Sequence, residues 1–438
     1  MQHPANSLLW FLALLPGGVF LFATTADHWT SIQAALHTLG RLAGIAGLSF
    51  LLVAAMLSSR VPGFDQIFGG LTKLWKTHHQ LAAVSFLLLL AHPLLFAFSA
   101  ATVSVDASAH TLFPLPWTLA IATGWLALIA MMIFLAPSFS FFSLPHYQRW
   151  KLLHKLAALA VVLALWHAFL LARTIHHPWD YIVWGVYALL AAAAVLYRWL
   201  FSRQVFFKKG RVKYRVKAVS YPVHGVAEVE LVPEKHLLHF SPGQFVYLTP
   251  YDKHLVAGYG QEHPFTLSSA PHEPNLRIAI KDLGDASRAL QTINLGSDVK
   301  IEGPYGAFFP RVENEDSELW IAGGIGITPF LSRARSLVQT QDEVDIHLVL
   351  CVQDEARALF REELEAIAAD LPGFIFTIHY FYQQGPLSAA FLTDHSPKFQ
   401  TRSCYICGPP AMLQHVQKLL HSAGVHRRQI HTEEFNLL

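Results

Sequence analysis

Long apolar runs fill the first 200 residues of the chain, and polar residues dominate only after them. Six runs are long enough to form membrane-spanning helices, since a hydrocarbon core of ~30 Å takes about 20 helical residues to cross. They lie near residues 7–24, 37–57, 78–100, 115–137, 151–173 and 178–200. The first run ends in "FATTA", which could be a signal-peptide cleavage site, but its polar start "MQHPANS" lacks Lys and Arg, which argues against that role. The pattern predicts a bundle of six transmembrane helices.

Positive charge is confined to alternate loops between these runs. The segments 58–77 and 138–155 carry Lys and Arg, whereas 24–36, 101–114 and 174–177 carry neither. Because positively charged loops stay on the cytoplasmic side, we expect both termini in the cytoplasm, together with everything after the sixth run. The expected location is a bacterial cytoplasmic (inner) membrane, with a multi-pass domain in contact with the lipid bilayer.

Beyond about residue 205 the apolar positions form short strands. The stretches "YRVKAVSY", "VAEVELV", "QFVYLTP", "LRIAIKD" and "DVKIEGP" are separated by turn-rich pieces, which predicts a small antiparallel β-barrel. After "ENEDSE", strands such as "ELWIAGG" and "EVDIHLVLCV" alternate with helices, which predicts an α/β domain with a parallel sheet. The expected domains are therefore the transmembrane bundle at 1–204, the β-barrel at 205–312 and the α/β domain at 313–438.

Composition supports this division. Hydrophobic residues make up 53% of the chain and charged residues 14%, and the mean hydropathy is +0.35, which indicates a membrane protein. The formal net charge of +2 is not gathered into a basic stripe, so nucleic-acid binding is not expected. The cysteines, Cys351, Cys404 and Cys407, imply no disulfide framework, and their C-x-x-C lacks the second ligand pair of a zinc site.

Two of the predicted membrane helices each carry a pair of histidines. His78 and His92 are 14 residues apart, and His154 and His167 are 13 apart. At ~1.5 Å per residue both pairs span about 20 Å, so the imidazoles can meet at two matching depths and hold two stacked b-type haems, each with two axial histidines. His78 would pair with His154 on the cytoplasmic side. His92 would pair with His167 on the outer side.

The rotational phase of the pairs is less regular than their depth. At ~100° per residue, 14 steps return to within about 40° of the same face, but 13 steps miss it by about 140°. The helix with His154 and His167 must therefore depart from ideal geometry, or its histidines must approach the irons from different sides. His79 is the alternative to His78, but its spacing from His92 has the poorer phase, which leaves it as a loop or propionate contact.

A charged residue accompanies the outer pair. Two axial histidines fill the coordination sphere of iron, so an acceptor must take its electron at the haem edge. Arg41, in "LGRLAG" of the second run, lies toward the outer side. Its guanidinium could pair with haem propionates or hold a developing superoxide anion, which makes Arg41 a candidate catalytic residue.

A glycine-rich turn, "GGIGITP", follows the strand "LWIA" and opens a helix. This is the right context for a dinucleotide pyrophosphate at a helix N-terminus, although it is not the Rossmann GxGxxG pattern. The candidate binding residues are Gly323, Gly324, Gly326 and Thr328, followed by Pro329.

Five motifs occur in order after both histidine pairs: "HPFTLSS", "KDLGDASRAL", "EGPYGAF", "AGGIGITPFLS" and "CGPP". With them, the chain resembles the ferric reductase and NADPH oxidase superfamily, in which a transmembrane haem domain is joined to a ferredoxin-reductase-like dehydrogenase. The resemblance covers nearly the whole chain. It implies FAD, two haem b groups and NADPH or NADH as cofactors, and activity as an NAD(P)H-dependent flavohaem oxidoreductase.

The resemblance also implies roles for particular residues. Phe265 would lie beside the isoalloxazine and Thr266 would hydrogen-bond near flavin N5, while His263 stands where soluble relatives have an arginine. Cys407 would lie beside the nicotinamide, and Phe435 would cover the flavin until the nicotinamide displaces it. The remaining residues implied in cofactor binding are Pro264, Ser268, Ser269, Lys281, Gly284, Ser287, Gly408 and Pro409.

The choice between NADPH and NADH depends on the residues after the strand "HLVLCV". NADPH-specific relatives often carry arginine there for the 2′-phosphate, whereas this chain has Gln353 and Asp354. Arg357 or Arg402 could compensate. The habit of the family favours NADPH.

The expected function is electron transfer from cytoplasmic NAD(P)H across the membrane to an outer acceptor. Arg41 favours O2 as that acceptor, giving superoxide. A ferric or cupric chelate is the alternative, since outer-side histidines could bind a metal; these are His28, His37, His110, His176 and His177. A non-enzymatic haem carrier or redox sensor is more distant, because it gives the FAD and nicotinamide motifs no purpose. The chain has no EF-hand loop and no long N-terminal regulatory domain, so no obligatory protein partner is expected.

Overall fold

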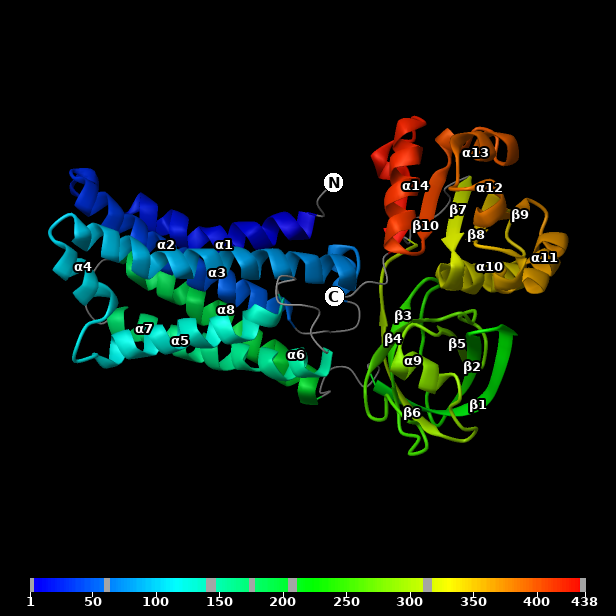
Figure 1. Ribbon diagram of the computed structural model, residues 1–438, viewed down its shortest axis with the longest axis horizontal. Helices are drawn as coiled ribbons and strands as arrows, with labels where there is room; N and C mark the ends of the chain where they lie inside the picture. The colour runs from blue at the N-terminus through cyan, green and yellow to red at the C-terminus, as the bar shows by residue number, and fades with distance from the viewer. Residues whose placement is uncertain are drawn as a thin grey trace. The chain divides into compact units, whose positions relative to one another are not determined.

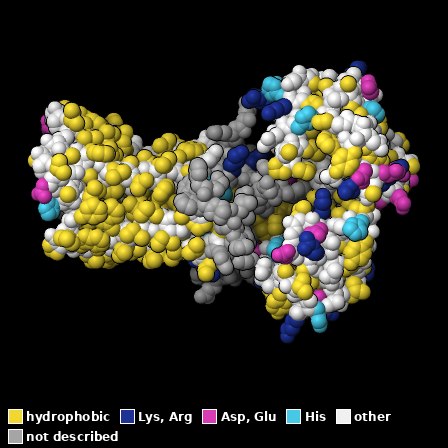
Figure 2. Space-filling view, viewed as in Figure 1, with side chains coloured by type: hydrophobic (Ala, Val, Ile, Leu, Met, Phe, Trp, Pro, Cys, Tyr) yellow, Lys and Arg dark blue, Asp and Glu magenta, His cyan; other side chains and the backbone are white. Residues whose placement is uncertain are grey.

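The protein forms two compact units in its computed structural model, one helical and one built on β-sheets (Figure 1). The structure describes residues 4–58, 64–138, 147–172, 178–203, 211–309 and 317–433. The helical unit takes Gln2–Arg60 and Lys73–Arg203, and the β-sheet unit takes Val61–Thr72 together with Gln204–Leu438. Figure 2 shows apolar side chains over the visible face of the helical unit, and charged side chains gathered on the β-sheet unit.

The helical unit is a bundle of apolar helices. They are α1 (Pro4–Phe22), α2 (Ile32–Leu57), α3 (Leu71–Ala101), α4 (Val105–Leu112), α5 (Leu119–Leu135), α6 (Tyr147–His154), α7 (Leu156–Ala172) and α8 (Pro178–Arg203). Side-chain caps begin three of them, within the described residues: the hydroxyls of Ser31, Ser104 and Thr118 accept from the N–H groups of Ala34, Ala107 and Ile121 at 3.1, 3.0 and 3.4 Å. Each cap satisfies a backbone donor that the first helical turn leaves open.

Among the described residues, four stretches are long and apolar enough to cross a membrane. They are Ile32–Leu57, Leu71–Ala101, Leu119–Ser138 and Leu152–Leu171. The first and sixth predicted runs contain shorter apolar stretches, at Asn6–Phe22 and Tyr181–Leu196. The structure thus contains four of the six expected spans, and the other two remain predictions.

The fifth predicted run is interrupted directly after its first histidine. Helix α6 ends at His154, α7 begins at Leu156, and Lys155 lies in a turn between them. The Lys155 N–H bonds to the Leu152 carbonyl and the Ala158 N–H to the Lys155 carbonyl, which is the tighter i→i+3 pattern of a 3₁₀ turn. The expected departure from ideal helix geometry is therefore confirmed, and the break lies between the two histidines.

A curled antiparallel sheet forms the first part of the β-sheet unit. Its strands are β1 (Arg211–Val223), β2 (Val226–Pro233), β3 (Phe245–Pro250), β4 (His263–Thr266), β5 (Leu276–Lys281) and β6 (Asp298–Tyr305), in the order β4-β3-β6-β1-β2-β5. An antiparallel bridge between Leu267 and Ile278 brings the two ends of this order together. A short helix, α9 (Asp285–Leu290), follows β5. The expected antiparallel domain is present, with "HPFT" as an additional strand.

A five-stranded parallel sheet forms the second part. Strands β7 (Glu318–Gly323), β8 (Ile346–Val352), β9 (Phe374–Tyr380), β10 (Ser403–Cys407) and β11 (Ile430–Glu433) have the order β11-β10-β7-β8-β9. The α-helices between these strands are α10 (Thr328–Thr340), α11 (Arg361–Asp370), α12 (Phe381–Gln384), α13 (Ala389–His395) and α14 (Pro410–Ser422). Side chains alternate across a strand, so Trp320 of β7 packs in one core with α10 and α11, while Leu319 and Ile321 pack in another with α13 and α14. The predicted α/β domain is confirmed.

A buried ion network joins the two sheets of this unit. The Arg335 guanidinium of α10 lies 2.9 Å from Glu228 of β2 and 2.6 Å from Glu363 of α11. It also donates to the Ser268 carbonyl at 2.9 Å. The Arg335 side chain is only 5% exposed, so these partners replace the water that its charge would otherwise bind.

A segment between α2 and α3 belongs to the β-sheet unit. Within residues 64–72, the Asp65 carboxylate accepts from the Gly306 N–H at 2.7 Å and is 1% exposed. The Thr72 hydroxyl donates to the Glu433 carboxylate at 3.5 Å. The segment thus contacts both the end of β6 and the end of β11, which the predicted domain boundaries did not anticipate.

Candidate functional site

The four histidines singled out in the membrane helices form two pairs. His78 faces His154 and His92 faces His167, with ring centroids 6.3 Å apart in both pairs. Two metal–nitrogen bonds of about 2 Å, with each nitrogen about 1 Å from its ring centroid, give a separation of about 6 Å. Both pairs therefore fit a single metal ion held between opposing imidazoles, as in a bis-histidine haem site.

Backbone carbonyls orient three of the four imidazoles. Nδ1 lies 2.7 Å from the Ala54 carbonyl in His78, 2.7 Å from that of Gly40 in His92, and 2.6 Å from that of Ala120 in His167. A carbonyl can only accept, so Nδ1 carries the proton and Nε2 is left as the ligand nitrogen, the usual arrangement for metal-binding histidine. In His154, Nδ1 is buried without a hydrogen-bond partner.

Both outer imidazoles lie against a glycine four residues beyond their carbonyl partner. A Cβ on Gly44 would be 2.8 Å from the His92 ring, and one on Gly124 would be 2.7 Å from the His167 ring. Gly44 follows Gly40 by four residues, as Gly124 follows Ala120. An imidazole that reaches the carbonyl of residue i in a helix crosses the Cα of residue i+4, so a larger residue there would displace it.

A cavity of about 290 Å³ lies between the two outer histidines. Phe96, Met131, Leu171 and Trp125 line it together with His92, His167 and Thr111. The aromatic and aliphatic walls suit a flat apolar macrocycle. The described residues in this cavity carry no charged side chain.

The structure separates the two rival histidines. His78 is half-buried and bonded to a carbonyl, whereas its neighbour His79 is exposed, with its ring centroid 5.6 Å from that of His78. The pairing expected for His78 therefore has a geometric basis that His79 lacks.

Arg41 is not part of the cavity lining. Its guanidinium lies over the Phe20 ring of α1, 5.0 Å from the ring centroid. Among the described residues no group of three or more His, Cys, Asp or Glu side chains could hold a metal ion. His28 contacts the hydroxyl of Thr25, and His110 lies 3.6 Å from the carboxylate of Asp106; His176 and His177 lie outside the described residues.

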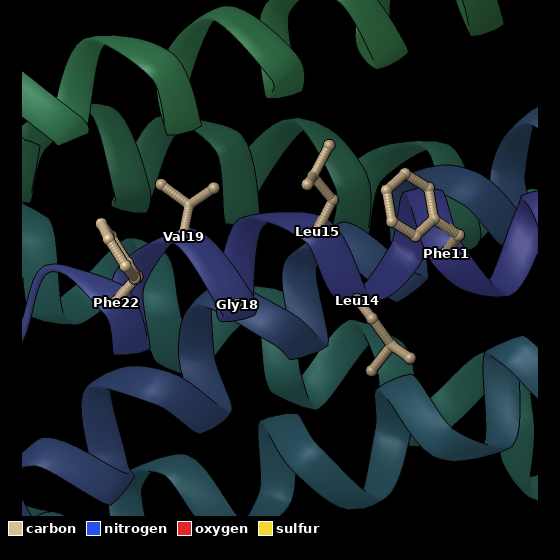
Figure 3. A pocket seen from close by; sticks show the side chains of 6 residues that line it. All are labelled: Phe11, Leu14, Leu15, Gly18, Val19 and Phe22. Atoms are coloured by element: carbon tan, nitrogen blue, oxygen red, sulfur yellow. The ribbon is translucent and has the colours of Figure 1, made fainter.

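A second hollow lies on α1 and has a different character. Figure 3 shows the side chains that line it, which are Phe11, Leu14, Leu15, Gly18, Val19 and Phe22. All come from one helix and all are apolar, so this groove offers no group that could orient a ligand.

The "HPFT" motif lies on β4, an edge strand paired with β3. Thr266 is opposite Phe245, Phe265 opposite Val246, and Pro264 opposite Tyr247. This pairing determines which face of the sheet each side chain points to. A flavin site requires its contacting side chains to lie on the same face. Nε2 of His263 is buried without a partner, and burial lowers the pKa of this imidazole. His263 is thus a neutral donor or acceptor rather than a positive clamp.

The two serines after this motif have different surroundings. The Ser268 hydroxyl donates to Glu228 at 2.7 Å, so it belongs to the Arg335 ion network. The Ser269 hydroxyl is buried without a partner, while its carbonyl accepts from Ser332 of α10 at 2.7 Å. Of the two, Ser269 is the one free to bind a ligand.

The "LGDAS" turn is locked by its own serine. The Ser287 hydroxyl accepts from the Leu283 N–H and donates to the Gly284 carbonyl, both at 2.9 Å. Lys281, at the end of β5, extends toward the nucleotide-binding turn: its Nζ would be 3.8 Å from a Cβ on Gly324. The structure thus brings a cation from the antiparallel sheet to the glycine turn of the parallel one.

The "GGIGITP" and "CGPP" turns pack backbone against backbone. A Cβ on Gly323 would lie 2.5 Å from the Met412 sulfur, one on Gly408 3.1 Å from the Gly323 Cα, and one on Gly326 2.6 Å from the Cys407 carbonyl carbon. The glycines are therefore required for this contact, apart from any phosphate that they bind. Thr328, expected to bind the nucleotide, donates to the Ile325 carbonyl at 3.0 Å and is 2% exposed, and Pro329 is also buried.

Cys407 is the last residue of β10, between Ala322 of β7 and Glu433 of β11. The thiol is fully buried, and burial followed by the carboxylate of Glu433 raises its pKa well above the usual value. The side chain is therefore a neutral thiol, suited to packing against a nicotinamide rather than to nucleophilic attack. Phe435 lies outside the described residues.

The two arginines considered for a 2′-phosphate lie at opposite edges of the parallel sheet. Arg402 precedes β10, pairs with Asp345 at 2.8 Å and donates to the Glu318 carbonyl at the start of β7. Ligands of such sheets bind at the carboxyl ends of the strands, so Arg402 is at the wrong edge. Arg357 is at the correct edge but pairs with Asp354, whose other carboxylate oxygen is buried without a partner.

Three residues of the sites were missed in the sequence. Gly44 and Gly124 are visible there as small residues in apolar runs, but only the structure shows which rings they contact. Ser85 lies midway between His78 and His92 and is fully buried. Its spacing of seven residues from each histidine was a signal that could have been used.

Three family models match the chain in succession. Ferric reductase like transmembrane component matches residues 43–165, FAD-binding domain matches 211–308, and Oxidoreductase NAD-binding domain matches 320–418. Together they cover the middle of the helical unit and most of both sheets of the other unit. The helical half is thus a membrane domain and the rest a flavin- and nicotinamide-dependent oxidoreductase module.

Several curated relatives match about half of the chain. The glycine betaine monooxygenase reductase subunit of Chromohalobacter salexigens is 28% identical over 215 residues, which is 45% of this chain and 57% of that protein. A ferredoxin--NAD(P)(+) reductase component of naphthalene 1,2-dioxygenase/salicylate 5-hydroxylase systems from Ralstonia sp. is 26% identical, over 51% of this chain and 69% of that protein. The chain thus spans little more than half of the first relative.

Among solved structures, a flavohemoglobin from Malassezia yamatoensis with bound FAD and heme aligns with 92% of this chain and 97% of its own, at a TM-score of 0.50 and 19% identity. This likeness concerns the fold alone. The assignment depends instead on the order of the three family matches, which is that of a transmembrane ferric-reductase-like domain followed by FAD and NAD modules. The chain has the architecture of the ferric reductase and NADPH oxidase superfamily.

Proposed function

We propose that the protein carries electrons from a cytoplasmic nicotinamide nucleotide through FAD and two bis-histidine b-type haems to an acceptor on the other side of the membrane. The observation that carries this proposal is the equal separation of the two histidine pairs, 6.3 Å between ring centroids in each. Two such pairs between α3 and the α6–α7 segment, joined to a flavin module in the same chain, would give electrons a route through the membrane. Six spans in a bacterial inner membrane, cytoplasmic termini and independence from partner proteins complete the proposal.

The residues of the β-sheet unit bind and orient the reactants. The turn at Gly323–Gly326 offers backbone N–H groups to the pyrophosphate of the nucleotide, with Lys281 nearby as a counter-charge. The neutral thiol of Cys407 packs beside the nicotinamide, and Thr266 donates to the flavin ring. Bound flavin accepts a hydride and can release electrons singly, which is what haem iron requires.

NADH fits the nucleotide site better than NADPH. Asp354 follows β8 at the carboxyl edge of the sheet, where an acidic residue accepts a hydrogen bond from the ribose 2′-hydroxyl. Its carboxylate would repel a 2′-phosphate, and Arg357 is already neutralised by Asp354. Asp354→Ala should therefore lower the ratio of kcat/KM for NADH to that for NADPH by about tenfold to a hundredfold, measured by flavin reduction. An unchanged ratio would contradict this assignment.

O2 is the acceptor that the outer site supports best. The cavity at His92 and His167 would be filled by the outer haem, so the acceptor would meet the haem edge among apolar and neutral side chains, which admit a small neutral molecule more readily than a charged chelate. The Arg41 guanidinium lies over the Phe20 ring, and this contact gives no added support for superoxide binding.

Stopped-flow spectroscopy of the purified, FAD-loaded protein tests the acceptor. The haems are reduced anaerobically with NADH, and the protein is then mixed with O2 or with a ferric chelate. Fast reoxidation by O2 with release of superoxide supports the oxidase. Slow reaction with O2 beside fast reaction with the chelate makes the protein a metal reductase, and absence of haem reduction by both NADH and NADPH removes the electron-transfer proposal altogether.

The haem sites have a separate test in the two neighbouring histidines. His78→Ala should lower haem content from about two to about one per polypeptide, because it removes one axial ligand. His79→Ala, one residue away and exposed, is the matched control and should retain both haems. Loss of haem from the control alone would exchange the roles of the two residues.

A further inference from the structure

Helices α2 and α3 are joined, within their described residues, by four hydrogen bonds from side chains to backbone carbonyls. The bonds run from His78 to Ala54, Ser85 to Gly47, His92 to Gly40 and Ser99 to Gln33, at 2.7, 2.8, 2.7 and 2.8 Å. The donors are seven residues apart along α3, and the acceptors are seven residues apart along α2 in the opposite direction. We call these four bonds the polar ladder.

The equal steps mean that the two helices keep one register over their contact. Seven residues of a straight α-helix fall about 20° short of two full turns, so three such steps would drift by about 60°. All four α3 donors nevertheless reach backbone carbonyls of the same helix, α2. The pair must therefore wrap around each other, as helices with a seven-residue repeat do.

Small residues let the helices approach closely enough for this contact. A Cβ on Gly47 would be 2.8 Å from the Leu89 side chain, and one on Gly40 would be 3.0 Å from the Phe96 ring. Close backbone approach of this kind is typical of helix contacts in membranes. It brings the α2 carbonyls within reach of the short serine side chains.

Ser85 is the central member of the ladder. It is fully buried and lies about 10 Å along the helix from each of the two α3 histidines. A serine in a helix can bond to a carbonyl of its own preceding turn, yet Ser85 donates to Gly47 of the neighbouring helix. Ser99 does the same beyond His92, toward the outer end.

We propose that Ser85 and Ser99 are positioning residues of the two haem sites, because they fix the register in which α3 presents His78 and His92 to the opposing histidines. A slip of one residue would move α3 by ~1.5 Å and turn it by ~100°. Such a slip would break all four bonds together. The inference rests on the proposed function, since it assigns a role in haem geometry to two serines that touch neither reactant.

The test compares substitutions that differ in one hydroxyl. Ser85→Ala removes the central bond, and Ser85→Thr keeps a hydroxyl at the same place. Ser49→Ala is the matched control, because Ser49 of α2 is also fully buried but its hydroxyl has no hydrogen-bond partner. The full-length protein is purified in detergent, and haem content and the low-spin ferric spectra of electron paramagnetic resonance are recorded. These spectra report the relative orientation of the axial imidazole planes, which loss of stability alone does not change.

Ser85→Ala should weaken haem retention by about three- to twentyfold and shift the signals of both haems, because it lies between them. Ser99→Ala should shift only the outer signal, which the spectrum of His92→Ala identifies. Ser85→Thr should restore the native spectrum, and Ser49→Ala should match it. If the Ser85→Ala protein does not accumulate, the inference is tested by two other results. These are the site-selective effect of Ser99→Ala and the spectrum of Ser85→Thr.

Three results would overturn the inference. They are a Ser85→Ala spectrum identical to that of Ser49→Ala, a Ser85→Thr variant that behaves like Ser85→Ala, and a Ser99→Ala variant that shifts both signals equally. A native protein without haem would instead overturn the proposed function itself. The two failures are therefore distinguishable in the same set of samples, and neither readout depends on NADH or O2.

Discussion

At the scale of single residues, the positions of the two outer imidazole rings depend on glycines in the neighbouring helices, which have no side chain to occupy the same space. Gly44 and Gly124 each leave room for an imidazole ring that hydrogen-bonds one helical turn earlier. The residue numbers of the histidine pairs could be predicted from the sequence, because depth along a helix depends only on spacing. The glycines could not, since their contacts join separate helices.

Replacing Gly124 with alanine should expel the outer haem. The new Cβ would lie 2.7 Å from His167 Nδ1, and crowding of this kind moves side chains in a packed interior. We expect haem content to fall from about two to about one per polypeptide. Gly185→Ala on α8 is the control, since nothing lies within 4 Å of its Cβ position, and full haem retention by Gly124→Ala would contradict the proposed packing.

His347 of β8 should make the β-sheet unit sensitive to acid. It is 1% exposed and bonds through Nε2 to the Thr377 hydroxyl at 2.9 Å. Burial, followed by the positive charge of Arg402, lowers its pKa to about 4, against about 6.5 in an unfolded chain. Between these values the unfolded state binds the additional proton, so stability is complete above pH 6.5 and is lost as the pH falls toward 4.

His347→Gln keeps a hydrogen-bonding group but does not titrate. The native protein should lose up to about 3 kcal/mol over this pH range from His347 alone, whereas the variant should show a flatter dependence. Thermal release of FAD, followed by its fluorescence between pH 4 and 7.5, measures the difference. Parallel curves for the two proteins would mean that His347 is not the titrating group.

At the scale of elements, the nucleotide site is a contact between two turns. Their glycines were predicted as phosphate ligands, and the structure adds that they allow the β7 and β10 turns to touch. Secondary structure was largely predictable because hydrophobic periodicity differs between strands and helices. The strand β4 was missed because "HPFT" is short and contains proline, which is tolerated on an edge strand such as this one.

Gly326→Ala should separate nucleotide binding from flavin binding. Its Cβ would collide with the Cys407 carbonyl, which is backbone and cannot rotate away. We expect the rate of flavin reduction by NADH to fall by about tenfold or more, since the two turns must move apart. FAD content and reduction by dithionite should stay unchanged, and an unaffected rate with NADH would show that the turns can separate without cost.

The break after His154 also belongs to this scale. The sequence indicated that 13 residues leave the two histidines out of phase, and the 3₁₀ turn at Lys155 lies between them. Its position could not be predicted, because no proline or glycine marks it. In a helix of this composition, contacts with the neighbouring helices determine where the regular hydrogen-bonding pattern is interrupted.

At the scale of the whole molecule, the two sheets of the β-sheet unit share one buried charge. Arg335 contacts Glu228 in one sheet and Glu363 beside the other. The sequence predicted the two domains, because their strand patterns differ, but not the ion network, in which Glu228 and Arg335 lie 107 residues apart. Long-range pairs of this kind leave no local pattern.

Arg335→Ala should destabilise the unit by about 3–5 kcal/mol, because it leaves buried carboxylates without a counter-charge. Denaturant titration with flavin fluorescence measures the loss. Arg361→Ala is the control, because Arg361 and its partner Glu365 are 39% and 51% exposed, and such pairs contribute less than about 1 kcal/mol. An equal loss of stability in both variants would contradict the proposal that the buried ion pairs of Arg335 stabilise the unit more than an exposed pair does.

The segment at residues 64–72 has a practical consequence for dissecting the protein. A dehydrogenase fragment cut at the predicted boundary of residue 205 would lack Asp65, and the Gly306 N–H would lose its buried acceptor. Expression of that fragment alone should therefore yield a less stable flavoprotein than one in which the missing segment is supplied as a fused peptide. Chimaeras that exchange dehydrogenases between relatives would have to carry this inter-helix loop with the flavin module, although the chain encodes it more than 100 residues earlier.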